Sequence, residues 1–179
     1  KVKNDRLDAK LLAHLLRTNL LAESYVPPKE IRQQRDLVRT RKALVEDRTR
    51  EKNRVRAVLA RTGNDYDREL FGPTGESYLA NLELDDVDRT VIEAHLDVIE
   101  ALDEQITELD KSIEDIASIR TPTQLLMTIP GISYYSSLLI TAEIGAVDRF
   151  PSEKKLVSYA GPDPTVHQSG DREVRGGIS

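Results

Sequence analysis

The feature that most constrains the fold is a long segment with no helix-breaking residue. Residues 29–62 contain neither glycine nor proline, and apolar residues such as Val38, Val45 and Val55 recur along them at helical spacing. This pattern predicts one helix of about nine turns, roughly 50 Å long. Gly63 is expected to end it.

A second segment, residues 77–118, repeats its apolar residues every seven positions. One heptad position is held by Ile92, Ile99, Ile106 and Ile113, and the other by His95, Leu102, Leu109 and Ile116. We expect a second long helix over 77–118, with a loop or short helix between the two. A lone helix of this kind is not stable. The two heptad positions form an apolar seam along one side of the helix. This seam predicts either an antiparallel hairpin within the chain or an intermolecular coiled coil.

Charge is segregated along these two segments. Residues 32–61 carry 11 Lys/Arg against 4 Asp/Glu, whereas residues 65–115 carry 17 Asp/Glu against 3 Lys/Arg. Two interpretations stay open: the basic segment faces nucleic-acid phosphates, or the two helices pair with each other. The net charge of −5 would also suit a high-salt organism, in which surface carboxylates keep proteins soluble.

Composition narrows the class of protein. Apolar residues make up 39% and charged residues 32%, which favours solvated helices over a thick globule. The absence of cysteine excludes disulfides and thiolate metal sites, and no apolar run is long enough to span a membrane. The chain begins at Lys1 and stops at Gly-Gly-Ile-Ser, so we expect a piece of a longer protein.

Two carboxylates open a predicted helix near the N-terminus, over residues 4–21. Asp5 and Asp8 lie three residues apart and so share one face. Such a pair suits a divalent cation, which prefers oxygen ligands. The alternative is that acids in a first turn only offset the helix dipole.

A Pro-Gly turn joins two short apolar helices further along the chain. Helices are expected over 123–129 and 133–143, with Ile129-Pro130-Gly131-Ile132 as the turn and Ser133 opening the second helix. This order is typical of a helix-hairpin-helix, whose backbone N–H groups face a DNA phosphate without reading sequence. A plain helical hairpin that builds a small core is the alternative.

After another short helix over 153–159, residues 164–170 are expected to form an irregular loop. Ser169 stands there beside a glycine, sterically open as a nucleophile must be. The alternative is an ordinary turn serine. Arg172 and Arg175 follow and could hold phosphates.

The motifs NDRLDA, VRTRKALVEDRTREKNRVRAVLARTG, LLMTIPGIS, LLITAEIGAVDRF and LVSYAGPDPTVHQSG follow one another in this order. Together they resemble the DEDD-type insertion-sequence transposases, the class that includes Piv-like invertases and bridge-RNA-guided recombinases. The resemblance implies a mainly α fold: long antiparallel or intermolecular coiled-coil helices, then a small transposase domain with a helix-hairpin-helix. The implied domains are a RuvC-like remnant over 1–24, a coiled-coil stalk over 25–120 and a truncated transposase domain over 121–179.

The resemblance also implies roles for particular residues. Asp5 and Asp8 match the last two acids of the DEDD set, which holds Mg²⁺ in the full-length protein. Ser169 matches a serine that forms a covalent link with DNA, and Pro130-Gly131 match the PGI signature. The implied nucleic-acid contacts are Pro130, Gly131, Ile132, Ser133, Arg172 and Arg175, with Arg48, Lys52 and Arg56 of the basic segment.

The expected function is thus a DNA transposase or recombinase of an insertion sequence, with this piece inactive alone. Its expected partners are DNA, a guide RNA if the chain is of the guided type, and further copies of itself through the coiled coil. A prokaryotic, cytoplasmic, nucleoid-associated location is implied, with no membrane contact. The alternative is a non-catalytic, nucleic-acid-binding coiled-coil scaffold.

Overall fold

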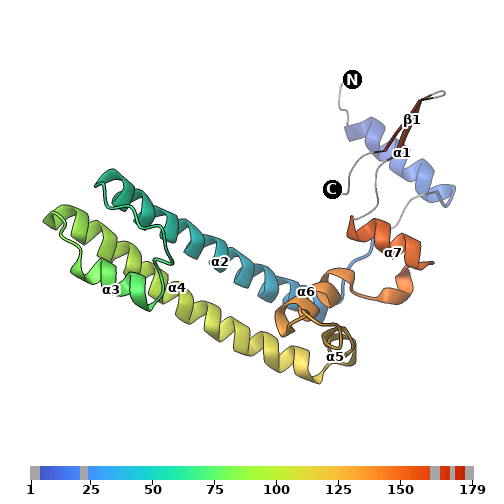
Figure 1. Cartoon of the computed structure of the whole chain (residues 1–179). Helices are drawn as coiled ribbons and strands as arrows, with labels where there is room; N and C mark the ends of the chain where they lie inside the picture. Colours follow the sequence, from blue (N-terminus) through green and yellow to red (C-terminus); the bar gives the residue numbers. More distant parts are fainter. Residues whose placement is uncertain (1–4, 21–23, 162–165, 170–171, 176–179) are drawn as a thin grey trace.

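The computed structural model describes residues 5–20, 24–161, 166–169 and 172–175, the last two ranges by their backbone only. The fold is mainly α, as the sequence predicts (Figure 1). In chain order the elements are α1 (Asp5–Arg17), α2 (Lys29–Arg61), α3 (Pro73–Asn81), α4 (Asp86–Ile119), α5 (Thr121–Met127), α6 (Tyr134–Ile144), the 3₁₀ turn η1 (Val147–Arg149), α7 (Glu153–Ala160), β1 (Val166–Ser169) and β2 (Arg172–Arg175).

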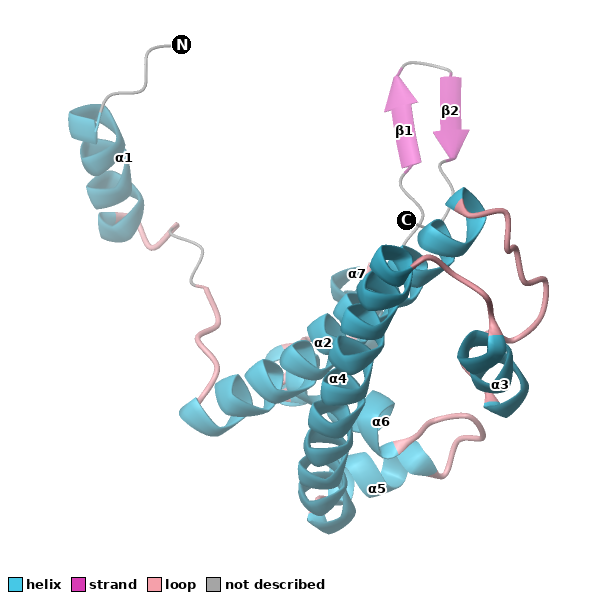
Figure 2. Ribbon diagram, turned by 90° about the vertical axis from the view of Figure 1, so that its left-hand side faces the viewer, coloured by secondary structure: helices cyan, strands magenta, loops and turns pink. Residues whose placement is uncertain are grey.

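The two longest helices, α2 and α4, run antiparallel side by side (Figures 1 and 2). Arg41 Nε lies 3.0 Å from Asp110 Oδ1 near one end of the pair, and Arg61 Nη2 lies 2.6 Å from Asp88 Oδ1 at the other. Arg48 pairs with Asp103 between them. The basic and acidic segments therefore pair within one chain, which is one of the two interpretations that the charge pattern left open.

The predicted isoleucine seam lies inside this helical pair. Its four residues are 1–7% exposed in the single chain, namely Ile92, Ile99, Ile106 and Ile113. The second heptad position, which includes Leu102 and Leu109, is half-buried. Because α2 of the same chain covers the isoleucines, the seam needs no second chain to fill it.

The predicted single helix over 77–118 is wrong at its start. The chain forms α3, breaks at 82–85, and resumes as α4. The break lets α3 fold back beside α4, where Leu79 is 4% exposed and Arg89 Nη1 donates to the Leu79 carbonyl at 2.9 Å. Asp85, Asp86 and Asp88 surround the real helix start, where acids offset the helix dipole.

The irregular loop predicted over 164–170 is also wrong in part. Residues 166–169 form β1, which pairs antiparallel with β2, and Ser169 stands opposite Arg172. Residues 162–165 and 170–171 lie outside the described part. In the sequence, a Gly-Asp pair lies between residues 166–169 and 172–175. Two such residues between short segments are one signal for a β-hairpin, and it was overlooked.

Helices α5 and α6 pack against the end of the helical pair where α4 finishes (Figure 2). Leu138 of α6 is fully buried against Val38, Ile113 and Ala117. Among the described residues, no helix is long and apolar enough to cross a membrane.

Candidate functional site

Asp5 and Asp8 occupy the first turn of α1, and both are exposed. Their carboxylates are the hard oxygen ligands that Mg²⁺ prefers, so the residue types fit this ion. Within the described ranges, however, no group of three or more metal-ligating side chains exists. Two carboxylates alone would be too few for such an ion.

The rest of α1 presents an apolar face to solvent. Leu7, Leu11, Leu12 and Leu16 are 54–69% exposed, and the helix buries no residue. Leucines at this spacing form one stripe of an amphipathic helix. Such a stripe marks a surface that packs against an apolar partner.

Ser169 ends β1, and the strand pairing sets its backbone opposite Arg172. The side chains of Ser169, Arg172 and Arg175 lie outside the described part of the chain. The structure does not bring the acids and the serine together. In Figure 2, α1 and the β1–β2 hairpin stand on opposite sides of the molecule.

The Pro-Gly turn between α5 and α6 is exposed to solvent. Gly131 adopts φ +90°, a left-handed conformation that favours glycine, and nothing lies within 4 Å of the position of a Cβ. Ile132 N–H donates to the Ile129 carbonyl at 3.2 Å and closes the turn. Pro130, Gly131 and Ser133 therefore gather on one exposed corner, with Ile132 half-buried beneath them.

Ser133 has a structural role at this corner. Its hydroxyl accepts from Ser136 N–H at 3.4 Å, while Ser136 Oγ accepts from Ser133 N–H at 2.8 Å. This capping box satisfies two of the donors at the start of α6. Fewer backbone N–H groups remain for a phosphate than the sequence pattern alone suggests.

Two arginines of α2 hold the other end of α6. Arg35 donates to the carbonyls of Ala142 at 2.7 Å and Glu143 at 2.9 Å, and Arg39 forms a two-pronged pair with the Glu143 carboxylate at 2.8 and 2.9 Å. Cations at a helix C-terminus also complement its dipole. From the sequence, both arginines belong to the basic segment 32–61. Their spacing does not reveal that they contact α6.

We expect Arg35→Ala to lower the free energy of unfolding by about 2 kcal/mol, because the part-buried carbonyls of Ala142 and Glu143 would lose a charged donor. The Arg35 side chain is only 16% exposed. Arg50→Ala is the matched control, since Arg50 is 61% exposed and pairs with Asp47 of its own helix; it should change stability by less than about 0.5 kcal/mol. Equal effects of the two substitutions in urea denaturation would contradict this role for Arg35.

The three cations assigned to nucleic acid lie in mixed surroundings. Arg48 is paired with Asp103. Lys52 Nζ and the Arg56 guanidinium lie 4.9 and 5.1 Å from the centre of the Phe71 ring. Only Arg56 is exposed.

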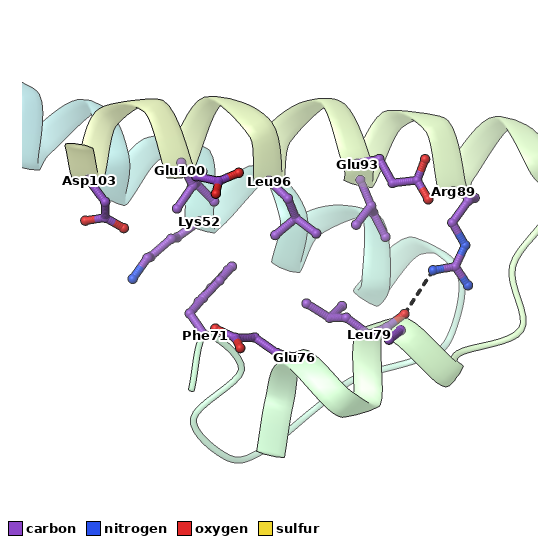
Figure 3. Close-up of a pocket in the computed structure, with 12 residues that line it drawn as sticks. Lys52, Phe71, Glu76, Leu79, Arg89, Glu93, Leu96, Glu100 and Asp103 are labelled. Carbon is purple, nitrogen blue, oxygen red and sulfur yellow. Dashed lines mark hydrogen bonds between the residues drawn. The ribbon is translucent and has the colours of Figure 1, made fainter. Parts of the chain in front are cut away.

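Lys52 also lines a cavity of about 500 Å³ between α3 and α4 (Figure 3). Apolar side chains such as Leu79 and Leu96 line it as well, and Figure 3 shows carboxylates around Lys52. The acids beside Lys52 are Glu100 and Asp103, while Glu76 and Glu93 line other parts of the cavity. Those beside Lys52 lower the positive potential that a phosphate would meet there.

Comparison with known proteins identifies the class. Residues 1–64 match the family model of the DEDD transposases of IS110, and residues 123–179 match the model described as the transposase IS116/IS110/IS902 family. The chain therefore carries two transposase domain segments, which fall on α1–α2 and on the part from α5 to the β-hairpin.

Two curated relatives match across the whole chain. The transposase for insertion sequence element IS1111A of Coxiella burnetii is 28% identical over 183 residues, which is 99% of this chain and 50% of that protein. A putative transposase, y4qE, of Sinorhizobium fredii is 27% identical over 179 residues, 100% of this chain and 44% of that protein. The chain therefore carries segments of IS110/IS116-family transposase domains toward both of its ends, and along its whole length it is similar to curated insertion-sequence transposases. It spans about half the length of the curated relatives it matches.

Proposed function

We propose that this chain is part of a transposase that cuts and rejoins the DNA of an insertion sequence. The observation that carries the proposal is the pair of domain matches, because they cover the residues assigned to chemistry. Asp5 and Asp8 fall in the first match, and Pro130, Gly131 and Ser169 fall in the second. Acting on DNA would place the protein in a prokaryotic cytoplasm, at the nucleoid.

Ser169 is the proposed nucleophile. As its Oγ bonds to the scissile phosphorus, the phosphorus–oxygen bond to one deoxyribose breaks, and that oxygen leaves as a hydroxyl after taking up a proton. The phosphoserine link conserves one phosphodiester bond for each bond broken. A hydroxyl of another strand then reverses the step and rejoins DNA without an external energy source.

Asp5 and Asp8 would hold a divalent metal, for which Mg²⁺ fits the oxygen donors. When bound, the ion stabilises negative charge on the phosphoryl oxygens. Two carboxylates are fewer than such sites use, so further ligands must come from elsewhere in the full-length protein. Because α1 and the β-hairpin lie on opposite sides of the molecule in Figure 2, we propose that the acids of one subunit meet the serine of another.

DNA contact is proposed at the exposed Pro-Gly corner and beside the serine. A helix-hairpin-helix formed by α5 and α6 would present the backbone around Gly131 to a phosphate. Arg172, directly opposite Ser169 in the strand pairing, would supply a charged donor near the scissile phosphate. Arg175, at the other end of β2, is a second proposed phosphate contact.

The proposed domains are a RuvC-like segment over 1–24, a coiled-coil stalk over 25–120 and a transposase domain over 121–179. The exposed leucine face of α1 supports the first boundary, because a helix of this kind packs against a larger apolar surface. A homo-oligomer through the stalk would use its outer faces, since the isoleucine seam is already covered. Exposed arginines of α2 such as Arg56 are the proposed contacts for a guide RNA or DNA.

The test uses the full-length protein and DNA that carries an element end. Ser169→Ala should lower covalent protein–DNA adduct, seen on a denaturing gel, by about 10³-fold or more, because the nucleophile is gone. Ser112→Ala is the control: Ser112 is exposed on α4, and its hydroxyl donates to the Glu108 carbonyl of the same helix. An adduct that persists in Ser169→Ala overturns the serine assignment.

The same assay addresses the metal and the non-catalytic alternative. Asp5→Asn or Asp8→Asn should reduce adduct formation in Mg²⁺ while DNA binding persists. If wild-type protein binds DNA tightly but forms neither adduct nor product under any condition, the scaffold interpretation replaces the enzymatic one.

A further inference from the structure

The guanidinium of Arg149 lies among three aromatic rings. Its carbon is 4.5 Å from the ring centre of Tyr25, 4.0 Å from that of Phe150 and 4.5 Å from that of Tyr159. Arg149 Nε donates to the Ile144 carbonyl at 3.2 Å, and Nη2 is buried with no hydrogen-bond partner among the described residues. Ring faces, rather than a carboxylate, therefore stabilise this charge.

The three rings come from three different segments of the chain, of which the one with Tyr25 is distant in sequence from the other two. Tyr25 lies in the link between α1 and α2, Phe150 follows η1, and Tyr159 belongs to α7. The Tyr25 hydroxyl accepts from Ala146 N–H at 3.3 Å, and the Phe150 and Tyr159 ring centres are 5.2 Å apart. We call Arg149, Tyr25, Phe150 and Tyr159 the aromatic clasp.

The aromatic clasp is anchored on the C-terminal end of α6. The Glu143 carbonyl accepts from the Tyr159 hydroxyl at 3.2 Å and from Arg35 Nη2 at 2.9 Å. Arg35 belongs to α2, so the anchor continues into the helical pair. The clasp is thereby fixed relative to the rigid part of the molecule.

Helix α7 depends on this anchor for its position. It contains no buried residue, and its Leu156 is only half-buried, so apolar packing contributes little to holding it in place. Tyr159 carries its ring contacts and its hydrogen bond to α6. Directly after α7, at Gly161, the chain leads toward β1 and Ser169.

We propose that Arg149 is a positioning residue for strand transfer. Its clasp joins the segment that leads out of the acid-bearing helix α1, at Tyr25, to the helix that leads into the serine-bearing strand, at Tyr159. Both routes to the proposed catalytic groups are thus tied to one point at the end of α6. The catalytic part rests on the proposed function, whereas the mechanical part can be tested without it.

The mechanical test measures one distance in the full-length protein. The chain contains no cysteine, so two introduced cysteines, Ser24→Cys and Lys155→Cys, can carry spin labels once any cysteine outside this chain is replaced by serine. Both positions are exposed, one beside Tyr25 and the other on α7. We expect one narrow distance distribution with Arg149 present and a broad one in Arg149→Met, which removes the planar cation.

A glycine supplies an independent way to disturb the clasp. A Cβ at Gly145 would lie 2.7 Å from the Tyr25 hydroxyl, so Gly145→Ala should displace Tyr25 and also broaden the distribution. Gly63→Ala is the matched control, because its φ of +73° resembles the +69° of Gly145 while nothing lies within 4 Å of its Cβ position. The control also places an alanine at a positive φ, and it should leave the label distance unchanged.

The catalytic test measures the rate of adduct formation. A displacement of about 1 Å at a reacting group costs on the order of 100-fold in rate, so Arg149→Met should slow the adduct by about 10- to 100-fold while the Kd for DNA stays within about twofold. Arg149→Lys keeps the charge but not the flat stacking surface, and should recover only part of the rate.

The outcomes separate the two proposals. A distribution that stays narrow in Arg149→Met overturns the clasp, whatever the activity. A broadened distribution with an unchanged adduct rate overturns the positioning role. A wild-type protein that forms no adduct overturns the proposed function, while the label distances still decide whether the clasp exists.

Discussion

Replacing Ile113 with alanine is expected to lower the free energy of unfolding by about 2–5 kcal/mol, the range for deleting a buried isoleucine side chain to its Cβ. Ile113 is 1% exposed and packs against Val38 of α2 and Leu138 of α6. It therefore joins three helices at the end of the stalk. Its removal therefore leaves a cavity among all three of them.

Ile119 provides the control for this substitution. It lies in the same helix but is 80% exposed, so Ile119→Ala should change stability by less than about 0.5 kcal/mol. Urea denaturation followed by circular dichroism gives both values. Hydrogen exchange adds a local measure: in Ile113→Ala the amides of α6 should lose more protection than those near Ile92. Similar losses for the two alanine variants would show that the isoleucine seam is not the core of the stalk.

The heptad pattern predicted this seam correctly because burial of apolar side chains dominates the choice of helix face. It could not say whether the second helix would come from the same chain, since the same isoleucines serve either arrangement. The charge pattern left two interpretations open, nucleic-acid contact and pairing between the two helices, and the ion pair of Arg41 with Asp110 shows the pairing. Each partly exposed ion pair of this kind contributes little stability. We infer that these pairs favour α2 as the partner of α4, whereas the buried isoleucines supply most of the stability.

The heptad pattern could not predict the break between α3 and α4. Residues 77–81 are helical in both the prediction and the structure. What ends α3 is tertiary: Leu79 reaches a core that also contains Leu70 and Ile92, and a straight helix would point it elsewhere. Tertiary packing of this kind overrides the helix propensity of a few residues.

The candidate site, too, could be predicted only in part from the chemistry of its residues. The Pro130-Gly131 corner could be derived from residues, because a left-handed glycine after proline leaves few alternatives. The roles of Asp5, Asp8 and Ser169 came from resemblance, since their local spacing fits common structural uses equally well. The aromatic clasp left no sequence pattern at all: its tyrosines and arginine are brought together only by the packing of α6 against α2.

Gly75→Ala is expected to destabilise the far end of the stalk by about 3 kcal/mol, the upper part of the usual cost of overpacking. A Cβ at this position would lie 2.1 Å from the Leu70 carbonyl oxygen and 2.5 Å from the Leu70 Cα. Both are backbone atoms, so no side-chain rotation relieves the clash. Alanine is favoured over glycine inside a helix by about 1 kcal/mol, which is too small to compensate. α3 must therefore move away from Leu70, a residue that is 1% exposed in the core.

Gly72→Ala separates this clash from the general effect of removing a glycine. The nearest atom to its Cβ is Glu69 Cγ at 3.3 Å, part of a flexible side chain, and we expect a change below about 1 kcal/mol. Urea denaturation gives the stabilities, and the stacked pair of Tyr66 and Tyr78, with ring centres 4.5 Å apart, gives a local near-ultraviolet signal. That signal should weaken in Gly75→Ala and persist in Gly72→Ala. Should Gly75→Ala keep both its stability and its tyrosine signal, the close approach of α3 to Leu70 is wrong, and with it the placement of the cavity that α3 and α4 enclose.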